Sequence, residues 1–361
     1  MLGFHVVKRS KDAMPWWNAW LIRLGSILIG ALVCALVTVL LTGKDPVNVF
    51  TTMVDGAFGS ERRIWALLQG IAMLLCVSIA VTPAFKMRFW NIGAEGQALM
   101  GGLASAACMM FIGDRLPNWL MLIVMAVTSM LAGAIWGVIP ALFKARWNTN
   151  ETLFTLMMNY IAIQIVSYFI CIYATGGSGK IDVLNATTHT GWMPSIGGKA
   201  YLLNVIVVLI LTVIMYVYLK YSKQGYEIAV VGESENTAKY IGIDVRKVII
   251  RTMIISGLLC GLAGFLLVSG ADHTISRDTI AGRGFTAIMV SWLAKFNPLV
   301  MILTSFLLVF FEKGSSQVSQ LCGLNASFSD IITGIIIFFI IGSEFFINFK
   351  IMKNEKEVKK S

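Results

Sequence analysis

The chain has 361 residues, of which 57% are hydrophobic and 13% are charged, and its formal net charge is +10. A soluble domain carries about 25% charged residues, and one water-soluble core cannot bury this much apolar surface. The composition therefore excludes an ordinary soluble globular protein and predicts a protein that folds in the lipid bilayer. In a membrane protein an excess of Lys and Arg is typical of cytoplasmic loops, so no nucleic-acid partner is expected.

Apolar runs follow one another along the chain, and a spanning helix needs about 20 such residues. The third run is short and begins in a glycine-rich turn, and two further short pieces flank Asn297-Pro298. With both short pieces counted, the sequence predicts an all-α polytopic membrane protein of about ten transmembrane helices. The expected spans are 20–41, 64–85, 98–112, 119–143, 152–173, 201–219, 248–268 and 328–346, with short helices at 285–293 and 299–311.

The basic residues predict the orientation of the chain. With the N-terminus in the cytoplasm, most Lys and Arg residues fall on the inner side, as the positive-inside rule requires. Both termini are then cytoplasmic, and the segment 174–200 faces out. The first residues are mixed and basic, which is not the pattern of a cleaved signal. We expect a cytoplasmic lead over 1–19, a single transmembrane domain over 20–347 with a cytoplasmic loop at 220–247, and a basic tail over 348–361.

The first candidate site is the segment 91–97, where Asn91, Glu95 and Gln97 alternate with small residues. Glycine lets backbones approach closely and permits a break in a helix. Such a break is tolerated at membrane depth only where it is buried or lines a cavity, and polar groups there are costly and usually functional. We predict that these three residues lie on a solute path. The alternative is an ordinary interfacial loop between two spans.

The second candidate site lies at the start of the fifth span. Glu151, Thr155 and Asn159 recur every four residues, so they share one face of a helix. A polar stripe that enters a membrane helix is expected to face a pore or a partner helix, and we place Glu151 and Asn159 on the solute path. The alternative is hydrogen bonding between helices.

The third candidate site is the pair of short helices around Asn297-Pro298. Short segments interrupted by Gly or Pro point to a transport site, and Ser291, Lys295 and Asn297 lie near this interruption. We include Ser291 and Asn297 among the path residues. The alternative is a re-entrant hairpin that does not touch the solute.

The charged loop predicts a docking surface on the cytoplasmic side. Residues 233–240 are expected to form a short helix, ended by Gly242 because Gly favours the position after a helix C-terminus. An ordered helix between two spans suggests a contact with another protein, and the alternative is a solvated connector. The candidate coupling residues are Gly225, Glu233, Glu235, Ala238, Lys239 and Gly242.

Several kinds of chemistry are not expected. Gly176–Lys180 imitates a phosphate-binding loop, but Ala174 and Ile181 replace its required first Gly and its final Ser or Thr. No nucleophile elbow, metalloprotease motif or paired carboxylates occur, and the cysteines and histidines are scattered. We therefore expect no enzyme activity, catalytic residue, cofactor or metal. Energy for active transport has to come from another subunit or from an ion gradient.

Five ordered segments together resemble one family. The sharpest is NIGAEGQ at 91–97, and NETLFTLMMNYIA at 150–162 is similar to a second signature. The segments 225–267, 282–299 and 332–346 resemble its coupling loop with the following helix and its C-terminal part. The chain resembles permeases of ABC importers for branched-chain amino acids, simple sugars and nucleosides, over residues 64–346. It looks most like the nucleoside and simple-sugar branch.

The resemblance implies a permease subunit in a bacterial plasma membrane. Its implied partners are a separate ATP-binding subunit that receives residues 233–242, a second permease that is identical or paralogous, and a solute-binding lipoprotein or periplasmic protein. Two departures are visible. Asn236-Thr237 replaces part of a Glu-Ala-Ala run, and Lys295 with Phe296 replaces the usual polar residues before Asn-Pro.

The solute implied by the resemblance is a nucleoside or simple sugar, and a branched-chain amino acid is an alternative. Another alternative is an ion-driven secondary transporter, in which Glu95 and Glu151 serve as proton sites. A membrane enzyme is disfavoured because no nucleophile–base or metal pattern is present. A passive channel would show flux without ATP.

Overall fold

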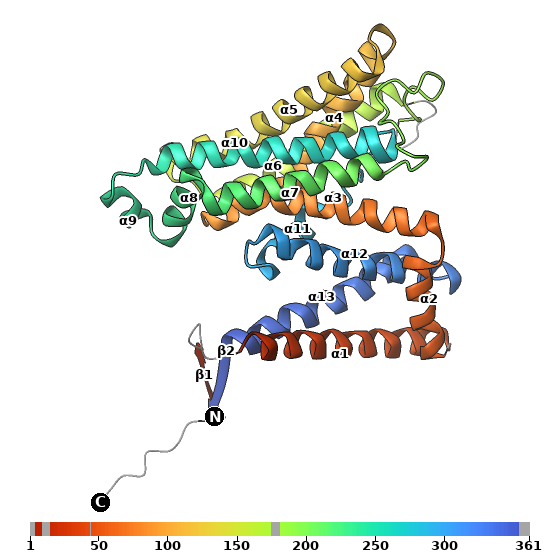
Figure 1. Cartoon of the computed structure of the whole chain (residues 1–361), viewed down its shortest axis with the longest axis vertical. Coiled ribbons are helices and arrows are strands. Elements are labelled where there is room, and N and C mark those ends of the chain that lie inside the picture. Colours follow the sequence, from red (N-terminus) through yellow and green to blue (C-terminus); the bar gives the residue numbers. More distant parts are fainter. Residues whose placement is uncertain (1–3, 9–14, 44, 175–180, 354–361) are drawn as a thin grey trace, which may run out of the picture. The chain divides into compact units, whose positions relative to one another are not determined.

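A computed structural model describes residues 4–8, 15–43, 45–174 and 181–353 of the chain. Most of the described chain is helical (Figure 1). It divides into two compact units, one formed by residues 65–306 and the other by residues 1–64 with 307–361. The segment Gly176–Lys180 and most of the predicted tail lie outside the described residues. A single transmembrane domain over 20–347 stays a prediction.

Within the described residues, eight helices are long and apolar enough to cross a membrane. They confirm the predicted all-α polytopic fold, while the exact number of spans and the side of the termini stay predictions. These helices are α1 (Trp16–Thr42), α3 (Glu61–Lys86), α5 (Asn118–Trp147), α6 (Glu151–Tyr173), α7 (Leu202–Tyr221), α10 (Val245–Leu267), α12 (Pro298–Leu321) and α13 (Ala326–Asn348). A π-helical turn, η3 (Val268–Asp272), continues α10.

Shorter elements complete the fold. Helix α4 (Ala94–Ile112) begins inside the segment 91–97, and α11 (Arg283–Leu293) is short, as predicted. Helix α2 (Pro46–Phe58) was not predicted, because it is too short to span. The Asp45 side chain caps α2 by accepting a hydrogen bond from the Val47 amide. The remaining elements are η1 (Gly113–Arg115), α8 (Lys223–Glu233), α9 (Glu235–Tyr240) and the antiparallel strands β1 (Phe4–Lys8) and β2 (Phe349–Lys353).

The predicted end of one short helix is wrong. The apolar piece 299–311 is only the first part of α12, which has 24 residues. The apolar run stops at Glu312, but the helix continues because its later polar side chains find partners. The Ser315 hydroxyl, for example, lies 2.8 Å from that of Ser329 on α13.

The core of unit 65–306 consists of helices that approach each other through glycines. Helices α4, α5 and α10 pack along one another (Figure 1). A Cβ atom added to Gly261 of α10 would lie 2.1 Å from the Ser129 carbonyl oxygen of α5, and one added to Gly264 would lie 2.1 Å from the Ala98 carbonyl oxygen of α4. Small residues allow this close backbone contact, which drives helix association where water supplies no hydrophobic force.

The other unit pairs α1 with α13. The Arg23 guanidinium binds the Glu344 carboxylate at 2.5 Å, and both side chains are about four-fifths buried. Gly30 approaches the Phe339 ring, and the Cys34 thiol donates to the Ile332 carbonyl. The two strands β1 and β2 pair in the same unit, with Val6 opposite Ile351.

Candidate functional site

The turn between α3 and α4 contains a buried cluster of amides. Asn91 and Gln97 are almost fully buried, and each amide binds the other: Asn91 Nδ2 donates to Gln97 Oε1 at 3.3 Å, and Gln97 Nε2 donates to Asn91 Oδ1 at 3.1 Å. Asn91 Nδ2 also lies 3.2 Å from the Ser256 hydroxyl of α10. The amides therefore tie α4 to α10 at the point where the chain changes direction.

The polar stripe of α6 completes this cluster. Asn159 Nδ2 donates to the Ile92 carbonyl and its Oδ1 accepts from the Gly96 amide, both at 2.8 Å. The Thr155 hydroxyl accepts a hydrogen bond from the Ile92 amide at 3.2 Å. Buried backbone groups that have no helical partner must find others. Asn159 and Thr155 supply them for the turn, and we call Asn91, Gln97, Thr155, Asn159 and Ser256 the amide hub.

Glu95 binds the start of α11 rather than the amide hub. Its Oε1 accepts from the Gly282 amide at 2.8 Å, and its Oε2 accepts from the Gly284 amide at 2.7 Å. A carboxylate at a helix N-terminus binds the unpaired amides and suits the helix dipole. At the other end of α11, Trp292 stacks on Trp90 with centroids 5.6 Å apart. Trp90 before α4 and Glu95 in its first turn thus hold the short helix α11 at both ends.

The other predicted path residues lie outside the amide hub. Glu151 forms an ion pair with Lys144 at 2.9 Å. Ser291 is buried and donates to the Ser78 carbonyl of α3 at 3.0 Å. Asn297 is exposed, and its Oδ1 accepts from the Leu299 amide at the start of α12. The geometry thus gathers Asn91, Gln97 and Asn159 in one cluster, with Glu95 beside it. Contact between the solute and any of the seven predicted path residues stays a prediction.

The charged loop at 220–247 forms two helices instead of the single one predicted. Glu233 ends α8, because Ser234 adopts extended backbone and caps α9, where its hydroxyl accepts from the Thr237 amide at 3.2 Å. Gly242 follows α9 with φ +85°, in agreement with its expected place after the helix. Of the predicted coupling residues, Gly225 and Ala238 are buried, and Glu233, Glu235, Lys239 and Gly242 are exposed.

The α8–α9 hairpin packs directly on the end of α3. A Cβ atom on Gly232 would lie 2.1 Å from the Lys86 carbonyl oxygen, so only glycine fits without displacement. Arg251 of α10 binds Glu227 of α8 at 2.8 Å. Lys86 precedes Asn91 by five residues, so the hairpin contacts the backbone of the chain just before the amide hub.

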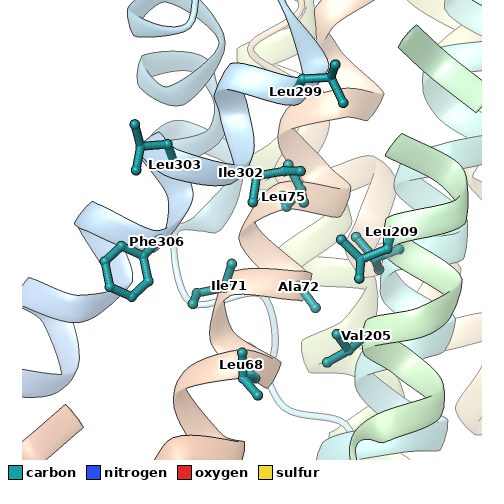
Figure 2. Close-up of a pocket in the computed structure, with 11 residues that line it drawn as sticks. Leu68, Ile71, Ala72, Leu75, Val205, Leu209, Leu299, Ile302, Leu303 and Phe306 are labelled. Atoms are coloured by element: carbon teal, nitrogen blue, oxygen red, sulfur yellow. The ribbon is translucent and has the colours of Figure 1, made fainter. Parts of the chain in front are cut away.

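One cavity of about 430 Å³ lies between α3, α7 and α12 within unit 65–306. Its walls are entirely apolar, with Leu75, Leu209 and Ile302 among the side chains that point into it (Figure 2). It offers no donor or acceptor to orient a polar solute, and binding sites for such solutes need a few well-placed polar groups. This cavity is not a candidate for the solute site.

The sequence reasoning missed the segment 273–282 between α10 and α11. At its start, the His273 carbonyl accepts from the Leu184 amide at 2.8 Å and the Ile275 carbonyl accepts from the Ile181 amide at 3.3 Å. The His273 ring stacks on Trp192 with centroids 3.8 Å apart. Burial, and after it the neighbouring His189, lowers the pKa of His273. No apolar run or motif marks this segment, and its only signal is the pair Gly282 and Gly284 around Arg283.

Comparison with known proteins gives a consistent result. Residues 63–341 match the family described as branched-chain amino acid transport system, permease component. The chain is 30% identical to the guanosine ABC transporter permease protein NupP of Bacillus subtilis, over 93% of this chain and 97% of that protein. It is 28% identical to the nucleoside ABC transporter permease protein NupB of Lactococcus lactis, over 89% and 90%. It is 26% identical to the glucose ABC transporter permease protein TsgB13 of Haloferax volcanii, over 94% and 92%.

Proposed function

We propose a function for this chain from one premise: it belongs to the family of permease components of branched-chain amino acid transport systems. It is a multi-pass membrane permease of an ABC importer, and its proposed solute is a nucleoside. The observation that carries this choice is the similarity over nearly the whole chain to two permeases named for guanosine and nucleosides. A simple sugar is the second candidate, because the glucose permease is similar over an equal share.

The proposed complex contains a separate ATP-binding subunit, a solute-binding protein and a second permease. The exposed residues Glu233, Glu235 and Lys239 of the α8–α9 hairpin form the proposed contact with the ATP-binding subunit, while Gly225 and Ala238 hold the hairpin in shape. The proposed orientation puts this hairpin in the cytoplasm, and the distribution of basic residues along the chain supports it.

The proposed mechanism is alternating access. ATP binding in the partner subunit moves the hairpin, and Gly232 transmits the movement to the end of α3 at Lys86. The amide hub and Glu95 then carry it to α4 and α11, because their hydrogen bonds make these elements move together. Rigid elements that shift between two arrangements are the usual basis of such transitions, and ATP drives the shift only through unequal affinity for the two states.

Uptake by the reconstituted transporter tests the solute. We expect liposomes that hold the chain, its ATP-binding subunit, the second permease and the solute-binding protein to accumulate radiolabelled guanosine when ATP is supplied. Excess adenosine or cytidine should reduce the accumulation, and excess glucose should not. Uptake of glucose alone would select the sugar. Uphill uptake by the isolated chain under a proton gradient would overturn the ABC mechanism.

The polar residues around α4 and α11 are tested in the same assay. We propose that Asn91, Glu95, Gln97 and Asn159 border the solute path and shape it through the elements that they hold. Alanine at Glu95 or Asn159 should then reduce uptake while the chain still inserts and assembles. Normal uptake by both variants would remove these residues from the path.

A further inference from the structure

The segment 273–282 runs alongside α4, and contacts at both ends fix its position there. Near the C-terminal end of α4, Asn185 Nδ2 donates to the Met109 carbonyl at 3.1 Å, and the adjacent Leu184 holds His273. Near the N-terminal end of α4, Glu95 holds Gly282. Chain positions 273 and 282 therefore lie at two different levels of the same helix.

The distance between these levels is a large fraction of the thickness of a membrane. Fourteen residues separate Glu95 from Met109, which corresponds to about 21 Å along a helix. The hydrocarbon core of a bilayer is about 30 Å thick. Because α4 packs lengthwise between the spans α5 and α10, the segment crosses most of the hydrocarbon layer without forming a helix. Its middle, around residues 277 and 278, lies near the midplane.

The side chains of this segment divide into a buried group and an exposed pair. Ile275, Thr279 and Ile280 are buried against the unit. A turn in which the Ser276 amide donates to the Thr279 hydroxyl at 2.8 Å turns Arg277 and Asp278 outward, and both are exposed. Within the described part of the chain, neither Arg277 nor Asp278 has an ion-pair partner.

Lipid cannot be the neighbour of this turn. Irregular backbone at membrane depth is tolerated only where it is buried in protein or lines a water-filled cavity. Charged side chains at that depth face a bundle interior or an aqueous path. Because Arg277 and Asp278 are exposed on the single chain, the surface that they share has to meet water, enclosed by a second permease.

We propose that Arg277 and Asp278 line the aqueous path near the bilayer midplane and form hydrogen bonds with the passing solute. The inference rests on the proposed function. Arg supplies several donors and Asp supplies acceptors, and together they suit an uncharged solute that carries hydroxyl, carbonyl and amino groups. A nucleoside is such a solute, and the opposite charges of the pair leave no net preference for an ion.

Cysteine labelling of the complete transporter tests the proposal. Arg277→Cys and Asp278→Cys are made in a parent chain in which Cys108, Cys171 and Cys322, the cysteines that are not buried, are changed to alanine. The probe is a charged, membrane-impermeant methanethiosulfonate. The matched control is Ile135→Cys, because Ile135 is 63% exposed on α5 and lies between Gly133, which meets Gly261, and Gly137, which meets Gln97. It therefore lies level with the start of α4.

We expect both test cysteines to react about tenfold faster than the control, because a thiol reacts as the thiolate and needs water to ionise. Saturating guanosine should slow their labelling. Labelling no faster than that of Ile135→Cys would overturn the proposal, as would fast labelling that no solute slows. Protection by glucose instead of guanosine would keep the path residues and reject the nucleoside, which separates the two hypotheses.

Conservative variants give a second measurement. Arg277→Lys and Asp278→Asn keep a donor or acceptor at each position and are expected to fold. We expect the KM for guanosine uptake to rise several-fold, because each variant weakens a direct hydrogen bond to the solute. An unchanged KM in both variants would contradict direct contact with the solute.

Discussion

Helices α10 and α1 belong to similarly apolar spans, yet 78% of the apolar stretch of the first and 22% of that of the second is buried within the chain. The difference follows from where their glycines lie. Gly257, Gly261 and Gly264 of α10 meet the backbones of α4 and α5. On α1, by contrast, nothing lies within 4 Å of a Cβ atom on Gly25, and one on Gly30 meets only the side chain of Phe339. Hydropathy indicates that a helix enters lipid, and the close contacts decide whether it packs at the centre or at the edge of its unit.

The strongest test of this comparison is leucine in place of one glycine in each helix. Gly261→Leu places a side chain where a Cβ atom alone is 2.1 Å from the Ser129 carbonyl oxygen, so we expect a loss of about 3 kcal/mol or more, the upper range for overpacked cores. Gly25→Leu should change stability little. Thermal unfolding in detergent measures both, and similar melting temperatures would refute the comparison.

A smaller loss of stability is expected when a buried amide side chain is removed. Asn159→Ala leaves the Gly96 amide and the Ile92 carbonyl without their partner, which costs about 2 kcal/mol for buried groups. The control Asn297→Ala removes only an exposed cap of α12, at about 1 kcal/mol or less. Denaturant or thermal unfolding measures the difference, and a larger loss in the control would show that the amide hub is not part of the core.

A third variant tests whether close packing also transmits movement. Gly232→Ala forces the α8–α9 hairpin away from the Lys86 carbonyl oxygen, and we expect a stability loss of about 1 kcal/mol. Uptake per ATP hydrolysed should fall several-fold because the hairpin no longer moves with α3. The control is Gly334→Ala on α13, where nothing lies within 4 Å. Unchanged coupling in Gly232→Ala would show that the force travels by another route.

The smallest expected effect is the pH dependence of stability caused by His273, the residue that follows η3. Burial, with a smaller contribution from His189, holds the pKa of His273 below its usual 6.5. As the pH falls through 6.5, the His273 imidazole of the unfolded chain binds a proton before that of the folded chain does. The contribution of neutral His273 to the free energy of unfolding is therefore complete above pH 6.5 and is lost as the pH falls toward the folded-state pKa. We expect the melting temperature of His273→Asn to fall less steeply on acidification than that of the parent. Equal slopes would contradict this.

The spans were predictable because each is a long apolar run with a clear boundary. The predicted limits of α3 and α6 differ from the observed ones by only a few residues. Prediction failed where apolar runs and helices do not coincide. Helix α12 continues past Glu312 on hydrogen bonds made to α13, and α2 is too short and too polar to be seen as a span.

Part of the site was predictable because polar residues stand out in or beside the apolar segments that are expected to span the membrane. Asn91, Gln97 and Asn159 were singled out in this way, and the fold brings them together. Their partners could not be read from the chain, because the Asn159 bonds join residues 63 and 67 positions apart. Arg277 and Asp278 were overlooked for the opposite reason, since charged residues between two spans look like an ordinary loop.

The sequence by itself determined that this is a membrane protein, where most of its helices begin and end, and to which family it belongs. Hydropathy, helix-end signals and ordered motifs are local properties of the chain, so they can be recognised without the structure. Only the tertiary structure decided that Glu95 binds α11 and that residues 273–282 run along α4. Both depend on backbone amides and carbonyls, which every residue carries and which acquire partners only when distant segments meet.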